Sequence, residues 1–327
     1  MKICIAVCAQ KLKAYFVVLL VMVTKQKGAL FTVLASLMFG LSPVFMKLVL
    51  DYVNIETMNV LFAVFASLLF LGYIVATRKT WHLLIIKNRW TVIGLLGLFD
   101  ASGSLLFAYG VFVSGPTSAS FIIQFTTVFS IFFGVVFLAE RLSRQEILGV
   151  AAALGGLFFL AYGNAQVELV STLAVLAAAV LFATVNVFSK YFVQDIPPFS
   201  LAGGRSFFIM LYLMAYALIL GKLEFNVPPV ALLYSVLGAV TGMVLSFVLF
   251  FKALETWEIS KTAAIRSMEP FLTALFSFFI LALEPTLNQL VGGVFIVLGV
   301  AILSLSREKT GKEVAKIRYV SGTGINP

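Results

Sequence analysis

Long apolar runs constrain this chain more than any other feature of its sequence. A helix needs about 20 consecutive apolar residues to cross about 30 Å of hydrocarbon, and ten such runs follow one another here with short polar connectors between them. Only 11% of the residues are charged, against about 25% in an ordinary soluble domain. The sequence therefore predicts an all-α integral membrane protein with ten transmembrane helices. The predicted spans lie near residues 28–50, 55–77, 90–113, 117–139, 145–163, 169–192, 198–220, 229–254, 260–283 and 286–306.

The charges between the spans predict how the chain is oriented. Basic residues collect in every second connector, beginning with the one after the second span, and acidic residues in the others, with Lys222 as the basic exception. Because cytoplasmic loops carry the excess of Lys and Arg, we expect both termini to be cytoplasmic in a multi-pass protein of the cell (plasma) membrane. The net charge of +9 is then a consequence of topology, and no nucleic-acid partner is predicted.

The two ends of the chain lie outside the predicted spans. Residues 1–27 form an N-terminal extension whose apolar stretch, 14–23, is too short to cross a bilayer. We interpret it as an interfacial extension, with translation from Met22 as the alternative. Residues 307–327 form a basic cytoplasmic tail.

An internal repeat divides the rest of the chain in two. A shift of 144 residues aligns the chain with itself without gaps, and it matches rare acidic residues at helix ends: Asp51 with Asp195, and Glu140 with Glu284. The repeats cover 28–163 and 169–306, with five predicted helices each. Since five is odd, the second repeat starts from the opposite side of the membrane. Inverted repeats of this kind are typical of alternating-access transporters, whose substrate site lies near the midplane where the halves meet.

Two stretches resemble a known family. They are "QFTTVFSIFFGVVFLAERLSRQEILGVAAALGGLFFL" (124–160) and its repeat partner "MEPFLTALFSFFILALEPTLNQLVGGVFIVLGVAIL" (268–303), together with "ASLMFGLSPVFMKL" (35–48). Each of the first two contains a helix ending in an acidic residue, a short polar turn and a Gly-rich helix. In these features the chain resembles the drug/metabolite transporter superfamily and, within it, the EamA-type ten-helix exporters.

The resemblance implies the fold and transport in the direction of export, but no particular substrate. Members of the superfamily move amino acids, nucleotide sugars, purine derivatives and other small metabolites. Two departures stand out: Thr126 occupies the position of the family's proline in the fourth helix, opposite Pro270, and the arginine at Arg205 has Leu61 as its partner in the first repeat.

Charged residues inside the ninth span are the first candidates for a site. Burying Arg266 and Glu269 at the lipid face would be costly, so both should face protein or water, and Pro270 should kink the helix. Glu269 either lines a central cavity and binds a cationic group or a proton, or is neutralised by Arg266, three residues earlier on the same helical face. A substrate that competes for the pair would combine the two interpretations.

Asp100 is the second candidate carboxylate, near the middle of the third span. Its small neighbours, Ser102 among them, leave room for water or a ligand. It either binds a cation or a proton, or forms a salt bridge with Lys47, Arg205 or Lys252. Arg205 and Arg266 are candidate anion-binding or pairing residues.

Weaker candidates are uncharged or lie at helix ends. Asn186, Gln124, Tyr109 and Ser102 have groups that hydrogen-bond either a substrate or a neighbouring helix. Glu140 and Glu284 end a helix beside a turn, so we expect them to cap the helix that follows.

The sequence lacks the motifs of other functional classes. It contains no GxxxxGK[ST] phosphate loop, GxSxG or HExxH, and Cys4, Cys8 and His82 are too few for a metal site. We therefore predict no enzyme activity, no cofactor and no metal. The predicted function is secondary transport of a small metabolite by alternating access, with a proton or counter-substrate as a possible coupling partner, in a monomer or homodimer within the lipid bilayer. The alternatives are a lipid-intermediate flippase and a membrane-embedded structural or enzyme subunit.

Overall fold

The computed structural model describes residues 28–138, 143–161, 168–192, 195–256, 262 and 265–302. Within those ranges the chain is helical apart from short connections, as the sequence predicts. The N-terminal extension 1–27 with Met22, the residue Glu140 and the basic tail 307–327 lie outside the described residues.

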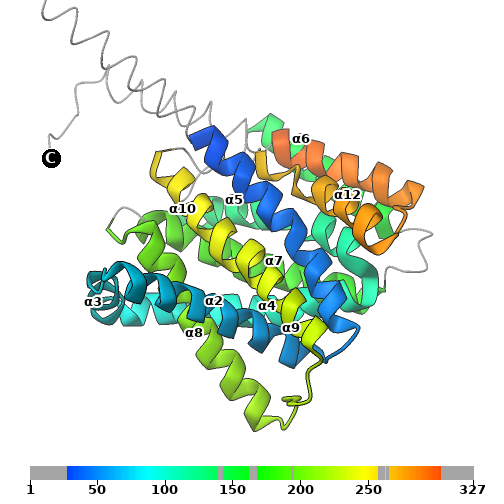
Figure 1. Ribbon diagram of the computed structural model, residues 1–327. Coiled ribbons are helices and arrows are strands. Elements are labelled where there is room, and N and C mark those ends of the chain that lie inside the picture. Colours follow the sequence, from blue (N-terminus) through cyan, green and yellow to red (C-terminus); the bar gives the residue numbers. More distant parts are fainter. Residues whose placement is uncertain are drawn as a thin grey trace, which may run out of the picture.

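The helices follow the apolar runs closely (Figure 1). Six of the described helices are long and apolar enough to cross a membrane, and three shorter apolar ones accompany them. In chain order the elements are Gly28–Leu50, α2 (Ile55–Thr77), α3 (Trp81–Asn88), α4 (Trp90–Ile122), α5 (Phe125–Leu138), α6 (Arg144–Ala161), α7 (Leu169–Phe192), α8 (Pro198–Ile219), α9 (Pro229–Gly238), the π-helical segment η1 (Ala239–Leu245), α10 (Ser246–Thr256), α12 (Glu269–Leu281) and Leu287–Ile302.

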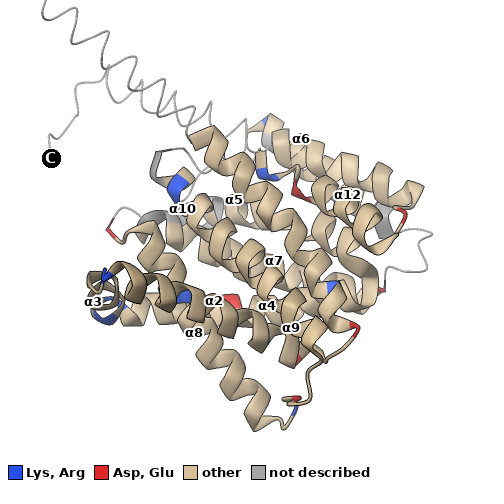
Figure 2. Cartoon of the chain, in the orientation of Figure 1, with Lys and Arg blue, Asp and Glu red and all other residues tan. Residues whose placement is uncertain are grey.

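Large apolar side chains cover much of the outer surface. Ile219, Phe225 and Leu287 are each at least 75% exposed, and many other Leu and Phe residues are more than 40% exposed. A soluble monomer rarely exposes so much apolar surface, whereas a bilayer requires it. Figure 2 shows most Lys, Arg, Asp and Glu residues near the ends of helices, with few inside. The chain is a multi-pass membrane protein.

Prolines and an asparagine set several helix starts. α8 begins at Pro198 and α9 at Pro229, where a missing N–H is tolerated because the first turn of a helix does not use it. Asn54 caps α2 by accepting a hydrogen bond from the backbone N–H of Thr57 at 2.8 Å. The same side chain donates to the carbonyl of Lys222 at 2.7 Å, so it also anchors the connector before α9.

Two predicted spans are interrupted in the structure. The stretch 117–139 was predicted as one helix, but its first residues continue α4 beyond a non-helical Gly115 (φ 79°, ψ 162°), and a break at residues 123–124 precedes α5. The stretch 260–283 was also predicted as one helix, kinked at Pro270. A turn at residues 267–268 interrupts it, and Pro270 lies in the first turn of α12.

The elements repeat at the spacing found in the sequence. Shifting α5 by 144 residues places its start, Phe125, on the start of α12, Glu269. The same shift places the break at 123–124 on the break at 267–268, and α2 on α8 to within two residues at each end. The broken helix is therefore a property of the repeated unit and not of Pro270 alone.

Two repeat-related helices touch through their backbones. Helix 287–302, orange in Figure 1, lies beside α6, its counterpart in the first repeat. A Cβ atom added to Gly156 would lie 2.5 Å from the carbonyl oxygen of Gly292, and one added to Gly299 would lie 2.5 Å from that of Gly149. Since real Cβ atoms do not approach so closely, the glycines are what allow these helices to meet.

Candidate functional site

A buried ion pair joins α4 to α8 in the interior. The Nε atom of Arg205 donates to Oδ2 of Asp100 at 2.7 Å, and its Nη2 atom contacts the same oxygen. Asp100 is 4% and Arg205 3% exposed. Of the three partners considered for Asp100, the structure selects Arg205, whereas Lys47 pairs with Asp51 at 3.2 Å.

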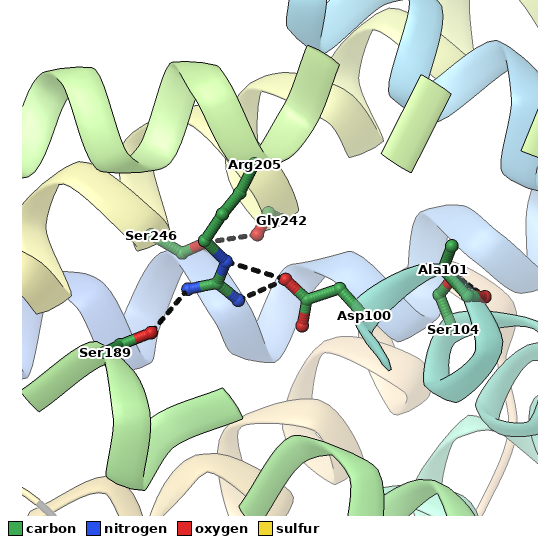
Figure 3. A network of polar contacts seen from close by, with 7 residues as sticks. All are labelled: Asp100, Ala101, Ser104, Ser189, Arg205, Gly242 and Ser246. Atoms are coloured by element: carbon green, nitrogen blue, oxygen red, sulfur yellow. Dashed lines mark hydrogen bonds and ion pairs between the residues drawn. The ribbon is translucent and has the colours of Figure 1, made fainter. Parts of the chain in front are cut away.

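The surroundings of Arg205 add a hydroxyl group and two aromatic rings to this ion pair. Figure 3 shows it between Asp100 and Ser189 of α7, whose Oγ accepts from Nη1 at 3.4 Å. Its central carbon lies 4.9 Å from the ring of Phe247 and 5.1 Å from that of Phe251, both on α10. Carboxylate, hydroxyl and aromatic faces together compensate for the burial of this cation.

Small residues bring α4 and α8 close enough for the pair to form. A Cβ atom added to Gly97, one turn before Asp100, would lie 2.7 Å from the Cβ of Phe208, one turn after Arg205. On α10, the hydroxyl of Ser246 donates to the carbonyl of Gly242 (Figure 3). Gly242 belongs to η1, and π-helical segments recur at functional sites.

A second ion pair lies at the break before α12. The Nε of Arg266 donates to Oε1 of Glu269 at 2.6 Å, and its Nη2 donates to Oε2 at 3.3 Å. This two-pronged geometry is the strong form of an arginine–carboxylate contact. The pair is more open than the first, since the Arg266 side chain is 20% and that of Glu269 8% exposed.

Two aromatic rings enclose the guanidinium of Arg266. Its central carbon lies 4.5 Å from the ring of Phe250 on α10 and 5.2 Å from that of Phe39 on helix 28–50. We call Phe39, Phe250 and Glu269 the aromatic box. The box draws on three helices, one from the first repeat and two from the second.

The broken backbone beside the box is repaired by a residue of the other repeat. Pro270 has no N–H to donate to the carbonyl of Arg266, four residues earlier. The Nε2 atom of Gln124 donates to that carbonyl at 3.1 Å instead. Gln124 itself lies in the break between α4 and α5, so the two breaks meet at this hydrogen bond.

Helix α10 connects the two ion pairs. Phe247 and Phe251 face Arg205, while Phe250 faces Arg266. The rings of Phe250 and Phe251 lie 5.5 Å apart. The two charge pairs are thus the ends of one polar and aromatic centre.

The charges of this centre break the internal symmetry. Each charged residue has an uncharged, apolar counterpart at a distance of 144 residues. The counterparts of Asp100, Arg205, Arg266 and Glu269 are Val244, Leu61, Ile122 and Phe125 respectively.

The remaining predicted residues have different surroundings. Asn186, Tyr109 and Ser102 are half-buried, and their side chains form no hydrogen bond within the described part of the chain. They stay predictions for substrate contact, as do the proton- and substrate-binding roles of Asp100 and Glu269.

The cap predicted at Glu284 belongs to a neighbouring residue. Glu284 is exposed in the connection before helix 287–302. The backbone N–H of Thr286 donates to Oε1 of Gln289 at 2.8 Å, and the N–H of Gln289 to the hydroxyl of Thr286 at 3.3 Å. This reciprocal capping box has the sequence signature Thr-x-x-Gln, which the interpretation of Glu284 overlooked.

The phenylalanines around the two arginines were missed as site residues. The sequence carries a signal for those on α10, because "FVLFF" (247–251) places three rings at positions i, i+3 and i+4 on one helical face. Phe39 carries no such signal.

Comparisons with known proteins agree on the class of this chain. The model of the EamA-like transporter family matches it twice, over residues 26–162 and 169–305. An uncharacterized transporter of Methanothermobacter thermautotrophicus is 25% identical over 295 residues, which are 84% of this chain and 85% of the relative. A protein of known crystal structure superimposes with a TM-score of 0.65 at 16% identity, over 87% of this chain and 99% of its own. At that identity the last likeness concerns the fold alone.

Proposed function

Because the chain belongs to the EamA-like transporter family, we propose that it is a secondary transporter that exports a small metabolite by alternating access. The substrate class includes amino acids, nucleosides and similar solutes. Transport runs on the gradient of the substrate, of a proton or of a counter-substrate.

The proposed architecture has ten transmembrane helices in two inverted five-helix repeats, 28–163 and 169–306. Support comes from the two family matches and from the equivalent starts of α5 and α12. Inversion places the N-terminal ends of α2 and α9 on one side of the membrane. There Lys222, the basic exception among the acidic connectors, pairs with Glu56 at 2.6 Å, so its charge is offset. This agrees with the proposed plasma-membrane topology with both termini in the cytoplasm.

One observation carries the proposal: two ion pairs lie within the apolar helical part of the chain, one fully buried and one partly buried at a broken helix. Ionisable residues within transmembrane segments are rare and mark substrate or ion pathways. Transporters build their binding sites from discontinuous helices at the interface of the repeats. Gln124 and Arg266 join the two breaks across that interface.

A proteoliposome assay tests the proposal. The purified protein is reconstituted with a pH-sensitive dye inside, and amino acids, nucleosides and quaternary amines are added one at a time outside. The assay also follows uptake of each labelled solute. We expect at least one solute to cross faster than in protein-free vesicles, and proton movement to accompany it if a proton is the coupling partner.

Three isosteric variants assign the carboxylates. Glu269→Gln and Asp100→Asn should impair transport, whereas Glu284→Gln, which changes an exposed carboxylate, should not. If no solute of the panel crosses the membrane in either direction, and solutes of other classes also fail, the transport proposal is wrong. Loss of transport in Glu284→Gln alone would refute the assignment of the interior pairs to the pathway.

A further inference from the structure

The aromatic box is a complete site for an organic cation, and Arg266 fills it. Two ring faces lie within 5.2 Å of the guanidinium carbon, and a carboxylate completes the enclosure. Aromatic faces with a neighbouring carboxylate are the arrangement by which proteins recognise quaternary ammonium and guanidinium groups. The chain thus supplies both the site and its occupant.

The comparison with Arg205 separates an occupant from a structural residue. Arg205 is closed off and reaches three helices besides its own: α4 through Asp100, α7 through Ser189 and α10 through two rings. Arg266 has a more exposed side chain, and among the described residues its guanidinium hydrogen-bonds Glu269 alone. The contacts that Arg266 would lose on leaving are those that an incoming cation would take over.

The backbone around Arg266 also permits its departure. A turn at 267–268 follows it, and its carbonyl is held by Gln124 and not by the helix ladder. A shift of the Arg266 backbone would therefore change the contact with Gln124 and leave the hydrogen bonds within α12 in place.

We propose that Phe39, Phe250 and Glu269 bind the cationic group of the transported solute, a quaternary ammonium or guanidinium group, which displaces the side chain of Arg266. This inference rests on the proposed transport function and names the substrate class of its site. Arg266 acts as an internal competitor: it keeps Glu269 paired while the box holds no ligand, and it lowers the apparent affinity by the fraction of time it occupies the box.

The charge of the box selects the ligand class. Glu269 and the electron-rich ring faces all attract positive charge. An anion would need Arg266 to stay and bind it, and a zwitterion would need both Arg266 and Glu269. Replacing Arg266 must therefore strengthen the binding of a simple cation and weaken the binding of an anion or zwitterion.

Calorimetric titration of the detergent-solubilised full chain measures whether replacing Arg266 raises or lowers the affinity for each class of ligand. The probes are tetramethylammonium, the zwitterion glycine betaine and acetate, at equal ionic strength. If Arg266 fills the box nine-tenths of the time or more, Arg266→Ala should bind tetramethylammonium about tenfold more tightly than wild type, or tighter still. Glu269→Gln and Phe250→Leu should weaken it. Phe279→Leu is the matched control, because it removes an α12 ring that is 73% exposed and lies outside the polar and aromatic centre.

Three results of these titrations would contradict the proposed cation site. Weaker or unchanged tetramethylammonium binding in Arg266→Ala would overturn the inference. So would tighter binding of acetate or betaine than of the cation in wild type, or an equal effect of Phe279→Leu and Phe250→Leu. Should Arg266→Ala fail to fold, Glu269→Gln and Phe250→Leu test the box on their own. Binding without transport in proteoliposomes would instead refute the transport function and leave the cation site standing.

Discussion

Removing one partner of the Asp100–Arg205 pair should destabilise the protein far more than removing both. Each of the two residues is at most 4% exposed, so Asp100→Val or Arg205→Leu leaves a charge buried without its partner, at a cost of about 3–5 kcal/mol. Replacing a buried pair by apolar residues is often close to neutral. The chain itself supplies the replacements, since Val244 and Leu61 occupy the equivalent positions of the other repeats. The double variant should therefore unfold within about 1 kcal/mol of wild type.

Reversible unfolding in mixed micelles of mild detergent and dodecyl sulfate, followed by circular dichroism, gives the four free energies of the cycle. The coupling between the two sites, which is the sum of the two single effects minus the effect of the double variant, should be about 5 kcal/mol or more. Asp51→Asn serves as the control: it breaks the exposed pair with Lys47, where both side chains are over 25% exposed, and should cost less than about 1 kcal/mol. A double variant as unstable as the sum of the two single variants would refute the view that Asp100 and Arg205 neutralise each other.

Three more predictions concern helix contacts and ends. Burial lowers the pKa of His82 below its ordinary value of 6.5, so the stability that neutral His82 contributes is complete above pH 6.5 and is lost as the pH falls below it. Melting temperatures at pH 7.5 and 5.5 should therefore differ more in wild type than in His82→Asn. An equal difference in the two proteins would contradict this. Gly156→Ala should lower the melting temperature, because its Cβ atom would lie 2.5 Å from the carbonyl oxygen of Gly292. Gly155→Ala has open space around it and should be neutral or stabilising by up to about 1 kcal/mol. The reverse order of the two melting temperatures would show that the helices do not meet at Gly156. Asn54→Ala should cost about 1 kcal/mol in the free energy of unfolding by removing the cap of α2, and chemical denaturation that gives no loss would exclude the cap.

Local patterns in the sequence predict a large part of the fold. The lengths of apolar runs locate the helices, and prolines locate the starts of α8 and α9, because both signals act within a few residues. The 144-residue repeat is equally easy to detect in the sequence, since finding it requires only an alignment of the chain with itself. Arg266 and Glu269 pair as their spacing of three residues predicts.

Contacts between distant segments were less predictable. Asp100 had three candidate partners in the sequence, and only the approach of α4 to α8 through Gly97 selects Arg205 over Lys47 and Lys252. The break at 123–124 has no proline to announce it, and Thr126 stands where Pro270 stands in the other repeat. The aromatic box depends on Phe39 and Phe250, which more than 200 residues of chain separate. Such sites arise from tertiary packing, which a pattern of single residues does not contain.

The apolar counterparts of the four buried charges have a consequence for the resting state of a transporter. If the two halves were identical, the form open to one side of the membrane and the form open to the other would be related by a two-fold rotation about an axis in the membrane plane, and they would be equal in free energy. Unequal populations can arise only from positions at which the halves differ. The four charges of the two ion pairs are such differences, because each has an apolar residue at the equivalent position of the other repeat. Under the proposed alternating-access mechanism, these charges bias which side of the membrane the empty protein faces, and moving a pair to the equivalent positions of the other repeat should reverse that bias.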